Sequence, residues 1–173
     1  MPAPHVPVGA AKRLETPYES APSAARERRE SERVITDWED ETRRLSHVLT
    51  LLTLNTSEMT TEKWAYRFIV GICPAIEDCT WLFYGERFAA LMELPEKANP
   101  SIPMIEQLPA RYVPVFTRGC IDATSHGVSV RLRGAVHRED SCQELYRAAF
   151  IHSSLDGYRL RHFVLGAFNC RVA

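Results

Sequence analysis

The chain has 173 residues, 45% of them hydrophobic and 25% charged, with a net charge of −1 at pH 7. Such values are typical of a soluble globular domain with an appendage, and they exclude the strongly basic surface that binds nucleic acid or an anionic membrane. No apolar run approaches the roughly 20 residues of a membrane span. We therefore expect neither nucleic acid nor a membrane as a partner.

The first 30 residues differ in composition from the rest of the chain. They are rich in Ala, Ser and Pro and contain few large apolar side chains. A segment of this kind cannot bury enough surface to offset the loss of chain entropy. We predict a disordered tail over 1–30.

The same segment bears on where the protein resides. MPAPHVPVGAAKRLETPYES has no basic stretch followed by an apolar core, so it does not resemble a secretory signal. The five cysteines include no CxxC pair, and thiols stay reduced inside the cell. We expect a cytoplasmic protein.

An amphipathic helix is predicted over 31–58, after the mixed-charge run RERRESER at 26–33. Thr36 and Glu39 make a capping-box pattern, so we place the first helical turn there. Apolar side chains then recur at helical spacing and form one stripe. Its members are Trp38, Leu45, Val48, Leu49 and Leu52. The stripe either covers the core of its own chain or pairs with a second subunit, and the sequence leaves both open.

Two strands are predicted next, over KWAYRFIVGI (63–72) and CTWLFYG (79–85). Alternation in the first strand puts four apolar side chains on one face: Trp64, Tyr66, Phe68 and Val70. In the second strand, the same rule separates two pairs: Trp81 and Phe83 on one face, Leu82 and Tyr84 on the other.

Two helices follow these strands. The first, over 86–94, lies between Gly85, which we expect to permit a sharp turn, and Pro95, which ends the helix. The second is predicted from about Arg111 and ends with Gly127 as its C′ residue.

Three more strands close the chain, over 128–138, 143–153 and 160–172, with turns at 138–142 and 154–159. Their alternation of apolar and polar residues indicates an antiparallel sheet. The order of elements predicts an α+β domain with one five-stranded antiparallel sheet and helices packed on one face.

WLFYGERFAALMELPE (81–96) resembles the segment of a PAS domain that leaves the second strand and enters a helix with the pattern N-x-x-F-x-x-L-x-G. Gly85, Phe88 and Leu91 fit this pattern, whereas Tyr84 or Gly85 replaces its Asn, and Leu94-Pro95 replaces its last Gly. ELYRAAFIHSSLD and FVLGAFNCRV resemble the last two PAS strands.

The resemblance assigns 59–173 to a PAS-like domain preceded by a flanking helix. It implies a sensory or interaction module of a bacterial-type regulator, often a homodimer through the N-terminal flanking helix, with a protein partner in a signalling pathway. We expect no enzymatic activity from such a module.

Two cofactors occur in PAS domains whose motifs can be compared with this sequence, flavin and haem. NCR at 169–171 matches the start of the NCRFLQ-like flavin motif, but that motif lies on a mid-domain helix and here it falls on the last strand, so flavin is not expected. Haem-binding PAS domains often use a histidine of the long helix. That helix has only His126 at its end, and His152 and His162 are strand residues. Our primary expectation is no cofactor, with haem left open.

Other chemistry finds little support. His137, Glu139, Asp140 and Cys142 cluster in one hairpin, but their spacing matches no usual zinc set, so no metal site is predicted. No signature ties a cysteine to a histidine, and there is no P-loop or GxGxxG. The alternative function is a small α+β enzyme with a cone-like pocket, of the isomerase or hydrolase type. Such an enzyme needs a buried acid, and we find no carboxylate on an apolar strand face.

The sequence thus favours a non-enzymatic, PAS-like sensory or interaction module that acts through dimerisation or partner binding. If its interior holds a small ligand, six aromatic residues are expected to line the site. They are Trp81, Phe83, Phe116, Tyr146, Phe150 and Phe168. The alternative is a core filled by its own side chains.

Overall fold

Five antiparallel strands form one sheet with the spatial order β2-β1-β5-β4-β3. They are β1 (Arg67–Ile72), β2 (Thr80–Tyr84), β3 (Val130–His137), β4 (Gln143–Leu155) and β5 (Arg161–Val172). The structure is a computed structural model that describes residues 32–33, 36, 62–127, 129–155 and 161–173. The predicted α+β class and the five-stranded antiparallel sheet are confirmed.

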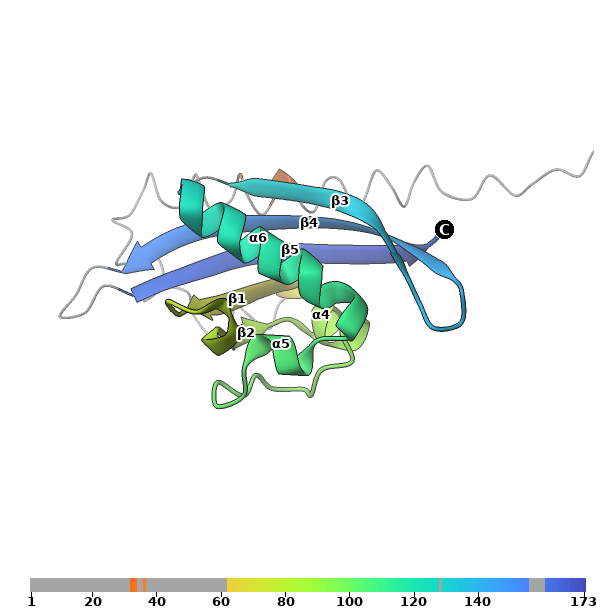
Figure 1. Cartoon of the computed structure of the whole chain (residues 1–173), viewed down its shortest axis with the longest axis horizontal. Helices are drawn as coiled ribbons and strands as arrows, with labels where there is room; N and C mark the ends of the chain where they lie inside the picture. Colours follow the sequence, from red (N-terminus) through yellow and green to blue (C-terminus); the bar gives the residue numbers. More distant parts are fainter. Residues whose placement is uncertain (1–31, 34–35, 37–61, 128, 156–160) are drawn as a thin grey trace, which may run out of the picture.

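The helices between β2 and β3 lie on one face of this sheet (Figure 1). They are α4 (Glu86–Leu91), α5 (Met104–Gln107) and α6 (Val113–His126). Three single 3-10 turns connect the elements: η1 (Glu62–Trp64), η2 (Ile76–Asp78) and η3 (Ala110–Tyr112). We call the sheet face under these helices the inner face and the opposite one the outer face.

The register of the two longest strands determines which side chains point inward. Phe150 of β4 pairs with Gly166 of β5, and Ala148 pairs with Phe168. Side chains alternate along a strand with period two, so even-numbered residues of both strands face the helices. The inner row of β4 therefore runs Glu144, Tyr146, Ala148, Phe150 and His152, with an ionisable residue at each end.

A β-bulge in β2 overturns the predicted orientation of that strand. Its register against β1 shifts between Ile69 and Val70, which makes Leu82 the extra residue. Trp81 points inward and is fully buried, whereas Phe83 belongs to the outer face. The prediction that Trp81 and Phe83 share a face was wrong because simple alternation fails across a bulge.

Trp64 also lies on a different face from the one predicted. It belongs to η1, ahead of β1, and packs in the outer cluster, whereas Phe68 and Val70 point inward. Its ring meets Phe83 edge-to-face, with 5.6 Å between centroids. A 3-10 turn does not alternate its side chains with period two, so the strand pattern could not be extended back to this residue.

Gly85 is required for space rather than for an unusual backbone conformation. Its φ of −80° and ψ of 163° are ordinary extended values. A Cβ at this position would lie 1.9 Å from the carbonyl oxygen of Trp64. The chains approach this closely because Gly85 N–H donates to the Arg67 carbonyl at 2.9 Å, and Phe88 N–H donates to the Ala65 carbonyl at 2.9 Å. Glycine is needed at this position because the backbone of Gly85 passes close to that of Trp64 and Ala65, and not because the chain turns sharply there.

The two main helices differ in how well their ends were predicted. α4 ends at Leu91, before the predicted residue 94, because Glu93 has a left-handed φ of 55°. The longer helix starts as predicted, with η3 leading into α6. It ends at Gly127, whose φ is 63° and whose N–H donates to the Ala123 carbonyl at 3.0 Å, as predicted.

Before Glu62, the described residues are Glu32, Arg33 and Thr36, and all three are helical. The Thr36 hydroxyl donates to the Glu32 carbonyl at 3.0 Å, so Thr36 lies inside a helical turn and the predicted N-cap at this residue was wrong. Glu32 and Arg33, at the end of the charged run, are already helical. The predicted tail over 1–30 and the stripe Trp38, Leu45, Val48, Leu49 and Leu52 lie outside the described residues. Within the described ranges, no helix is long and apolar enough to cross a bilayer.

Candidate functional site

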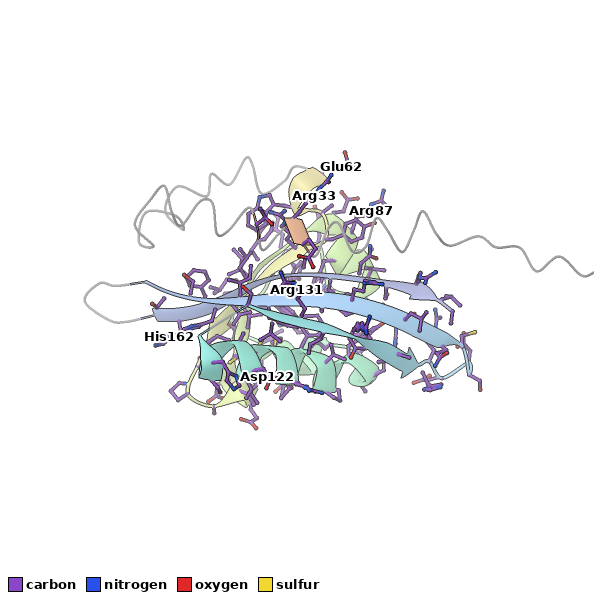
Figure 2. All side chains as sticks on the ribbon, turned by 90° about the horizontal axis from the view of Figure 1, so that it is seen from above. Arg33, Glu62, Arg87, Asp122, Arg131 and His162 are labelled. Atoms are coloured by element: carbon purple, nitrogen blue, oxygen red, sulfur yellow. The ribbon has the colours of Figure 1, made fainter. Side chains whose placement is uncertain are left out.

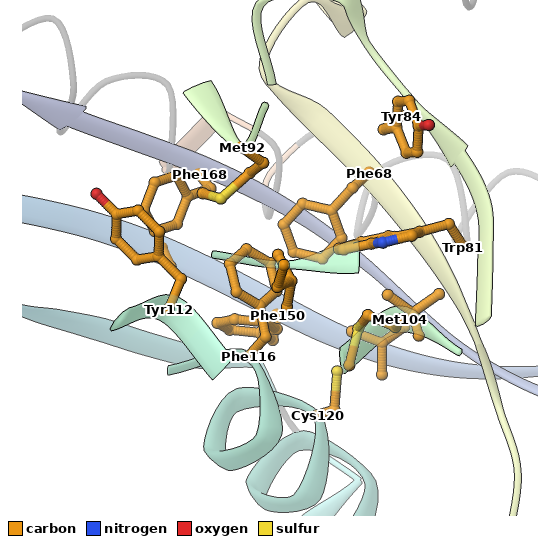
Figure 3. Close-up of a cluster of buried hydrophobic side chains, with 14 of the residues drawn as sticks. Phe68, Trp81, Tyr84, Met92, Met104, Tyr112, Phe116, Cys120, Phe150 and Phe168 are labelled. Carbon is orange, nitrogen blue, oxygen red and sulfur yellow. The ribbon is translucent and has the colours of Figure 1, made fainter. Parts of the chain in front are cut away.

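An aromatic cluster fills the space between the inner face and the helices (Figure 3). The ring centroid of Phe68 lies 5.1 Å from that of Phe88, 5.3 Å from Phe116 and 5.6 Å from Phe150. All four rings are fully buried. Tilted and edge-to-face contacts at these separations are the favoured geometry of aromatic pairs. The centre of the domain is therefore occupied by its own rings.

The structure brings together five of the six aromatic residues predicted to line a ligand site. Four lie in the buried cluster: Trp81, Phe116, Phe150 and Phe168. Tyr146 is half-buried and stacks on Phe168 at 6.0 Å, at the edge of the cluster. Phe83 does not join them, because the bulge in β2 turns it to the outer face.

A cavity of about 220 Å³ lies between α6, η2 and the end of β1. Its walls are Ile72, Cys73, Pro74 and Ile76 on one side and Cys120, Ile121, Thr124 and Ser125 of α6 on the other. Among the described atoms, the buried Thr124 hydroxyl has no hydrogen-bond partner. None of the six predicted aromatic residues lines this cavity. Its mixed apolar and hydroxyl walls suit a small neutral molecule.

Cys120 in the wall of this cavity and Cys79 nearby are poor nucleophiles. Cys120 is buried, and burial raises the pKa of its thiol far above the ordinary value. Burial also raises the pKa of Cys79, whose sulfur accepts a hydrogen bond from the Cys73 backbone N–H at 3.3 Å. The thiolate is the reactive form of cysteine. These two thiols stay protonated at neutral pH, so the site does not favour covalent catalysis through them.

Two histidines pair at the same end of the inner face. His152 Nε2 and His162 Nδ1 lie 3.0 Å apart and share a hydrogen bond. Burial, and then the neighbouring His162, lower the pKa of His152. His162 pairs across strands with Ile72, a wall of the cavity. These are the two strand histidines that the sequence offered as interior haem ligands. One ring nitrogen of each, His152 Nε2 and His162 Nδ1, takes part in the hydrogen bond between them.

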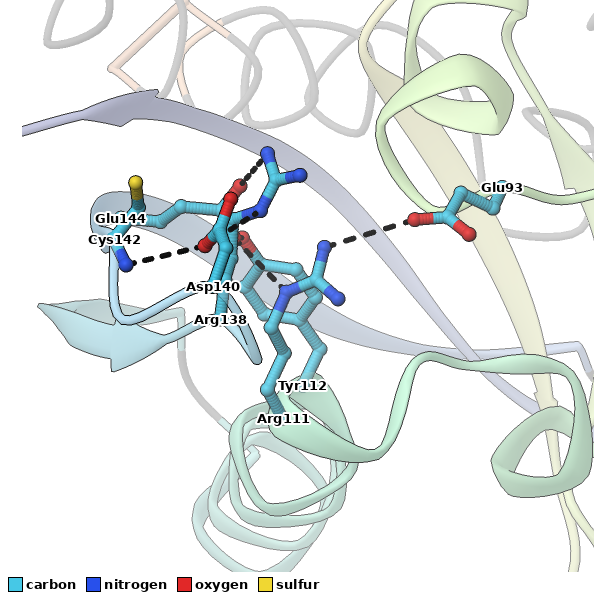
Figure 4. Close-up of polar contacts among 7 residues, drawn as sticks. All are labelled: Glu93, Arg111, Tyr112, Arg138, Asp140, Cys142 and Glu144. Atoms are coloured by element: carbon cyan, nitrogen blue, oxygen red, sulfur yellow. Dashed lines mark hydrogen bonds and ion pairs between the residues drawn. The ribbon is translucent and has the colours of Figure 1, made fainter.

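The opposite end of the inner face holds a buried carboxylate that the sequence analysis missed (Figure 4). Glu144 Oε2 accepts hydrogen bonds from the Tyr112 hydroxyl at 2.7 Å and from Arg111 Nε at 2.9 Å. Its Oε1 lies 3.5 Å from Arg138 Nη1. The statement that no carboxylate lies on an apolar strand face was therefore wrong. Period-two counting from Phe150 back along β4 would have placed Glu144 on the inner face.

The environment of Glu144 indicates a structural role for this carboxylate. Burial, followed by hydrogen bonds that include one to Glu144, raises the pKa of Tyr112 well above its ordinary range, so the phenol stays a donor. Burial alone would lower the pKa of Arg111, but the hydrogen bonds to Glu144 and Tyr112 and the charges of these groups together outweigh burial, and the pKa is raised. Glu144 Oε2 accepts the hydrogen bonds from Tyr112 and Arg111, and Oε1 lies in an ion pair with Arg138. A general base must reach the proton that it removes, and this carboxylate is buried and held by one hydroxyl and two guanidinium groups.

Two further motifs lie where the sequence placed them. Asn169, Cys170 and Arg171 are on β5, the last strand, as expected for a motif outside the flavin context. In the hairpin 138–142, Asp140 Oδ1 accepts from the Cys142 backbone N–H at 3.1 Å, which lowers the pKa of Asp140. Over the ranges that the structure describes, no three His, Cys, Asp or Glu side chains are grouped to hold a metal ion.

Comparison with known proteins adds no assignment. No model of a protein family matches this chain, and no curated protein matches it significantly. The functional interpretation therefore depends on the fold and the sites described above.

Proposed function

We propose that this protein is a non-enzymatic, PAS-like sensory or interaction module that acts through dimerisation or through binding of a protein partner. The order of elements supports this: two strands, a set of short helices and a three-strand meander, as the resemblance to PAS domains implies. The N-terminal segment and the outer face of the sheet are the surfaces proposed to carry the contacts.

The observation that carries the proposal is the apolar outer face. We call the outer cluster the set of buried side chains on this face: Trp64, Ile69, Ala149, Ile151, Phe163, Leu165 and Ala167. An antiparallel sheet with one covered face usually presents polar side chains on the other. Here both faces are apolar, and an apolar sheet face is stable only when another element packs on it. Both faces of the sheet therefore need an element packed on them, and we propose that the element covering the outer face mediates the contact with a second subunit or a partner.

The inner face supports binding better than it supports catalysis. Glu144 has both oxygens engaged by Tyr112, Arg111 and Arg138, and the thiols of Cys79 and Cys120 are kept protonated by burial. The enzyme alternative would need one of these groups to be free at a cavity. In the proposed module, a small ligand occupies the cavity between α6 and η2, where Thr124 offers a hydroxyl.

Native mass spectrometry and light scattering on the full chain test the proposal. We expect a dimer mass, a bound small molecule, or both. Thr124→Val removes the cavity hydroxyl at nearly constant volume and is expected to weaken ligand binding. Thr117→Val, on the same helix but outside the cavity, is the matched control.

Two results would contradict the proposal. A bare monomer at every concentration would argue against both the dimer and the ligand. Turnover of ester or keto–enol substrates that is lost in Glu144→Gln would support the enzyme instead, because that substitution removes the charge of the buried carboxylate while keeping its shape.

A further inference from the structure

The outer cluster is almost completely removed from solvent. Leu165 and Phe163 are each 2% exposed, Ile69 is 3% exposed and Ile151 is 5% exposed. These fractions belong to one chain alone, with no second copy present. All described members of the cluster come from the sheet itself except Trp64, which lies at the β1 side. Side chains of an open sheet face cannot shield one another to this extent, so another part of the same chain covers them.

Two described contacts place the chain before 37–61 and the chain after it near opposite sides of the sheet. At the β3 edge, Arg131 Nε and Nη2 donate to the two carboxylate oxygens of Glu32 at 3.2 and 3.1 Å. Figure 2 shows Arg33, Glu62 and Arg131 on the side of the sheet away from Asp122 of α6. Near the β1 and β2 side, Trp64 packs on Phe83. The chain between Thr36 and Glu62 thus starts beside one edge strand and returns near the other.

The connection is long enough for the distance to be crossed. From β3 to β1 the sheet spans three strand spacings of about 4.8 Å, or roughly 14 Å. A helix over 37–54 alone would be roughly 27 Å long at about 1.5 Å per residue. The segment also carries the one long apolar stripe of the N-terminal region, which ends at Leu52. Its apolar surface complements the outer cluster.

We infer that the 37–61 segment packs through its apolar stripe onto the outer face of its own chain. The sequence left open whether the stripe covers its own chain or pairs with a second subunit. This inference chooses packing within the same chain. A second copy or a protein partner would then meet the solvent side of this segment or displace it from the sheet. The inference concerns packing within one chain and does not depend on the proposed function.

The reactivity of a cysteine introduced on the outer face measures whether this face is covered. Ala149 lies on β4 in the outer cluster and is 0% exposed, so Ala149→Cys adds little volume there. Ala135→Cys, on the exposed part of β3, is the matched accessible control. We expect iodoacetamide to label residue 149 about 100-fold more slowly than residue 135, as followed by peptide mass spectrometry, because buried groups react only on local opening. Ala167→Cys, also in the cluster, serves as a second probe if the first variant folds poorly.

Two leucines test whether the stripe provides the protection. In a helix, positions 49 and 54 differ by about 140° around the axis, so Leu49 lies on the stripe and Leu54 lies off it. Leu49→Glu in the full chain should remove most of the protection at residue 149, and Leu54→Glu should leave it intact. The protection should also be independent of protein concentration, because the cover belongs to the same chain.

Three outcomes would overturn the inference. Protection that falls on dilution would assign the cover to a second copy. Equal effects of Leu49→Glu and Leu54→Glu would show that the stripe is not the contact. Labelling of residue 149 as fast as residue 135 would show that the face is open. None of these readouts measures ligand binding or enzymatic turnover, so failure here and failure of the proposed function are distinguishable.

Discussion

The two faces of the sheet are both apolar, but they are built from different side chains. The inner face buries Phe68 and Phe150, which contact each other and Phe116 of α6 in tilted and edge-to-face geometry. The outer face is mainly aliphatic, with Ile69, Ile151 and Leu165 beside Phe163. Aromatic pairs have preferred geometries, whereas burial of aliphatic surface is non-directional. The inner face therefore depends on ring geometry, whereas the outer face depends on the area of aliphatic surface that is buried.

The largest effect is expected from opening the inner face. Phe68→Ala should lower the free energy of unfolding by about 4 kcal/mol, because a fully buried ring leaves a cavity. Leu165→Ala on the outer face should cost about 3 kcal/mol if that face is covered. Urea denaturation followed by circular dichroism measures both. Leu82→Ala, at an exposed position, is the control and should change stability by less than about 0.5 kcal/mol.

A cost below about 1 kcal/mol for Leu165→Ala would break the comparison, because it would mean that the outer face gains little from burial.

Overpacking provides the next test. A Cβ on Gly119 of α6 would lie 2.3 Å from the ring of Phe150, so Gly119→Ala should cost about 2 kcal/mol by pushing the helix off the inner face. The matched control is Gly71→Ala in β1, where the Cβ would lie 3.3 Å from the Leu82 side chain, which can move. Thermal unfolding of the two variants should separate them clearly. Equal losses would show that α6 tolerates the added methyl as easily as the outer face does.

The polar end of the inner face should depend on one hydroxyl. Tyr112→Phe keeps the ring next to Phe168, at 5.1 Å between centroids, and removes the hydrogen bond to Glu144. The expected loss is about 1.5 kcal/mol, because a hydrogen bond to a charged group is lost. A double-mutant cycle with Glu144→Gln, measured by urea denaturation, isolates the coupling between the two side chains. Additive effects would contradict the structural role assigned to Glu144.

The histidine end should give the smallest effect, visible as a pH dependence. The pKa of His152 is lowered from 6.5 in the folded state, so the unfolded state binds more protons as the pH falls through about 6.5. Stability should therefore decrease from neutral to mildly acidic pH. His152→Asn should flatten this dependence, and His137→Asn in the exposed hairpin should not. Unfolding midpoints at several pH values provide the measurement, and an unchanged slope in His152→Asn would contradict the assignment.

The fold was more predictable than the candidate sites. Alternation identified the strands of the meander, and Gly127 marked the end of α6, because both signals are local. The sheet face to which Trp64 and Phe83 belong was mispredicted. A 3-10 turn and a bulge interrupt the alternation of side chains without any clear mark in the sequence. The helix cap at Thr36 was also mispredicted, because a capping pattern inside a charged run does not exclude an earlier start.

The sites depend on residues that the chain holds far apart. Arg111 and Glu144 are separated by 33 positions and meet only because η3 lies beside the start of β4. The His152–His162 pair likewise requires the β4–β5 register. Five of the six aromatic candidates, all except Phe83, lie in the inner cluster or at its edge, but sequence alone could not show whether they enclose a ligand or pack on one another.

The sequence by itself determined the class of this protein: the strands, the two main helices, their order and the α+β sheet architecture. Those features follow from hydrophobic period and from turn residues, which act over a few neighbouring positions. The tertiary structure decided which side chains of β2 point inward on either side of the bulge. It also decided the ring packing of the core, the burial of Glu144 and the position of the cavity by α6. These depend on register and on close packing between distant segments, where a shift of one residue reverses every side chain.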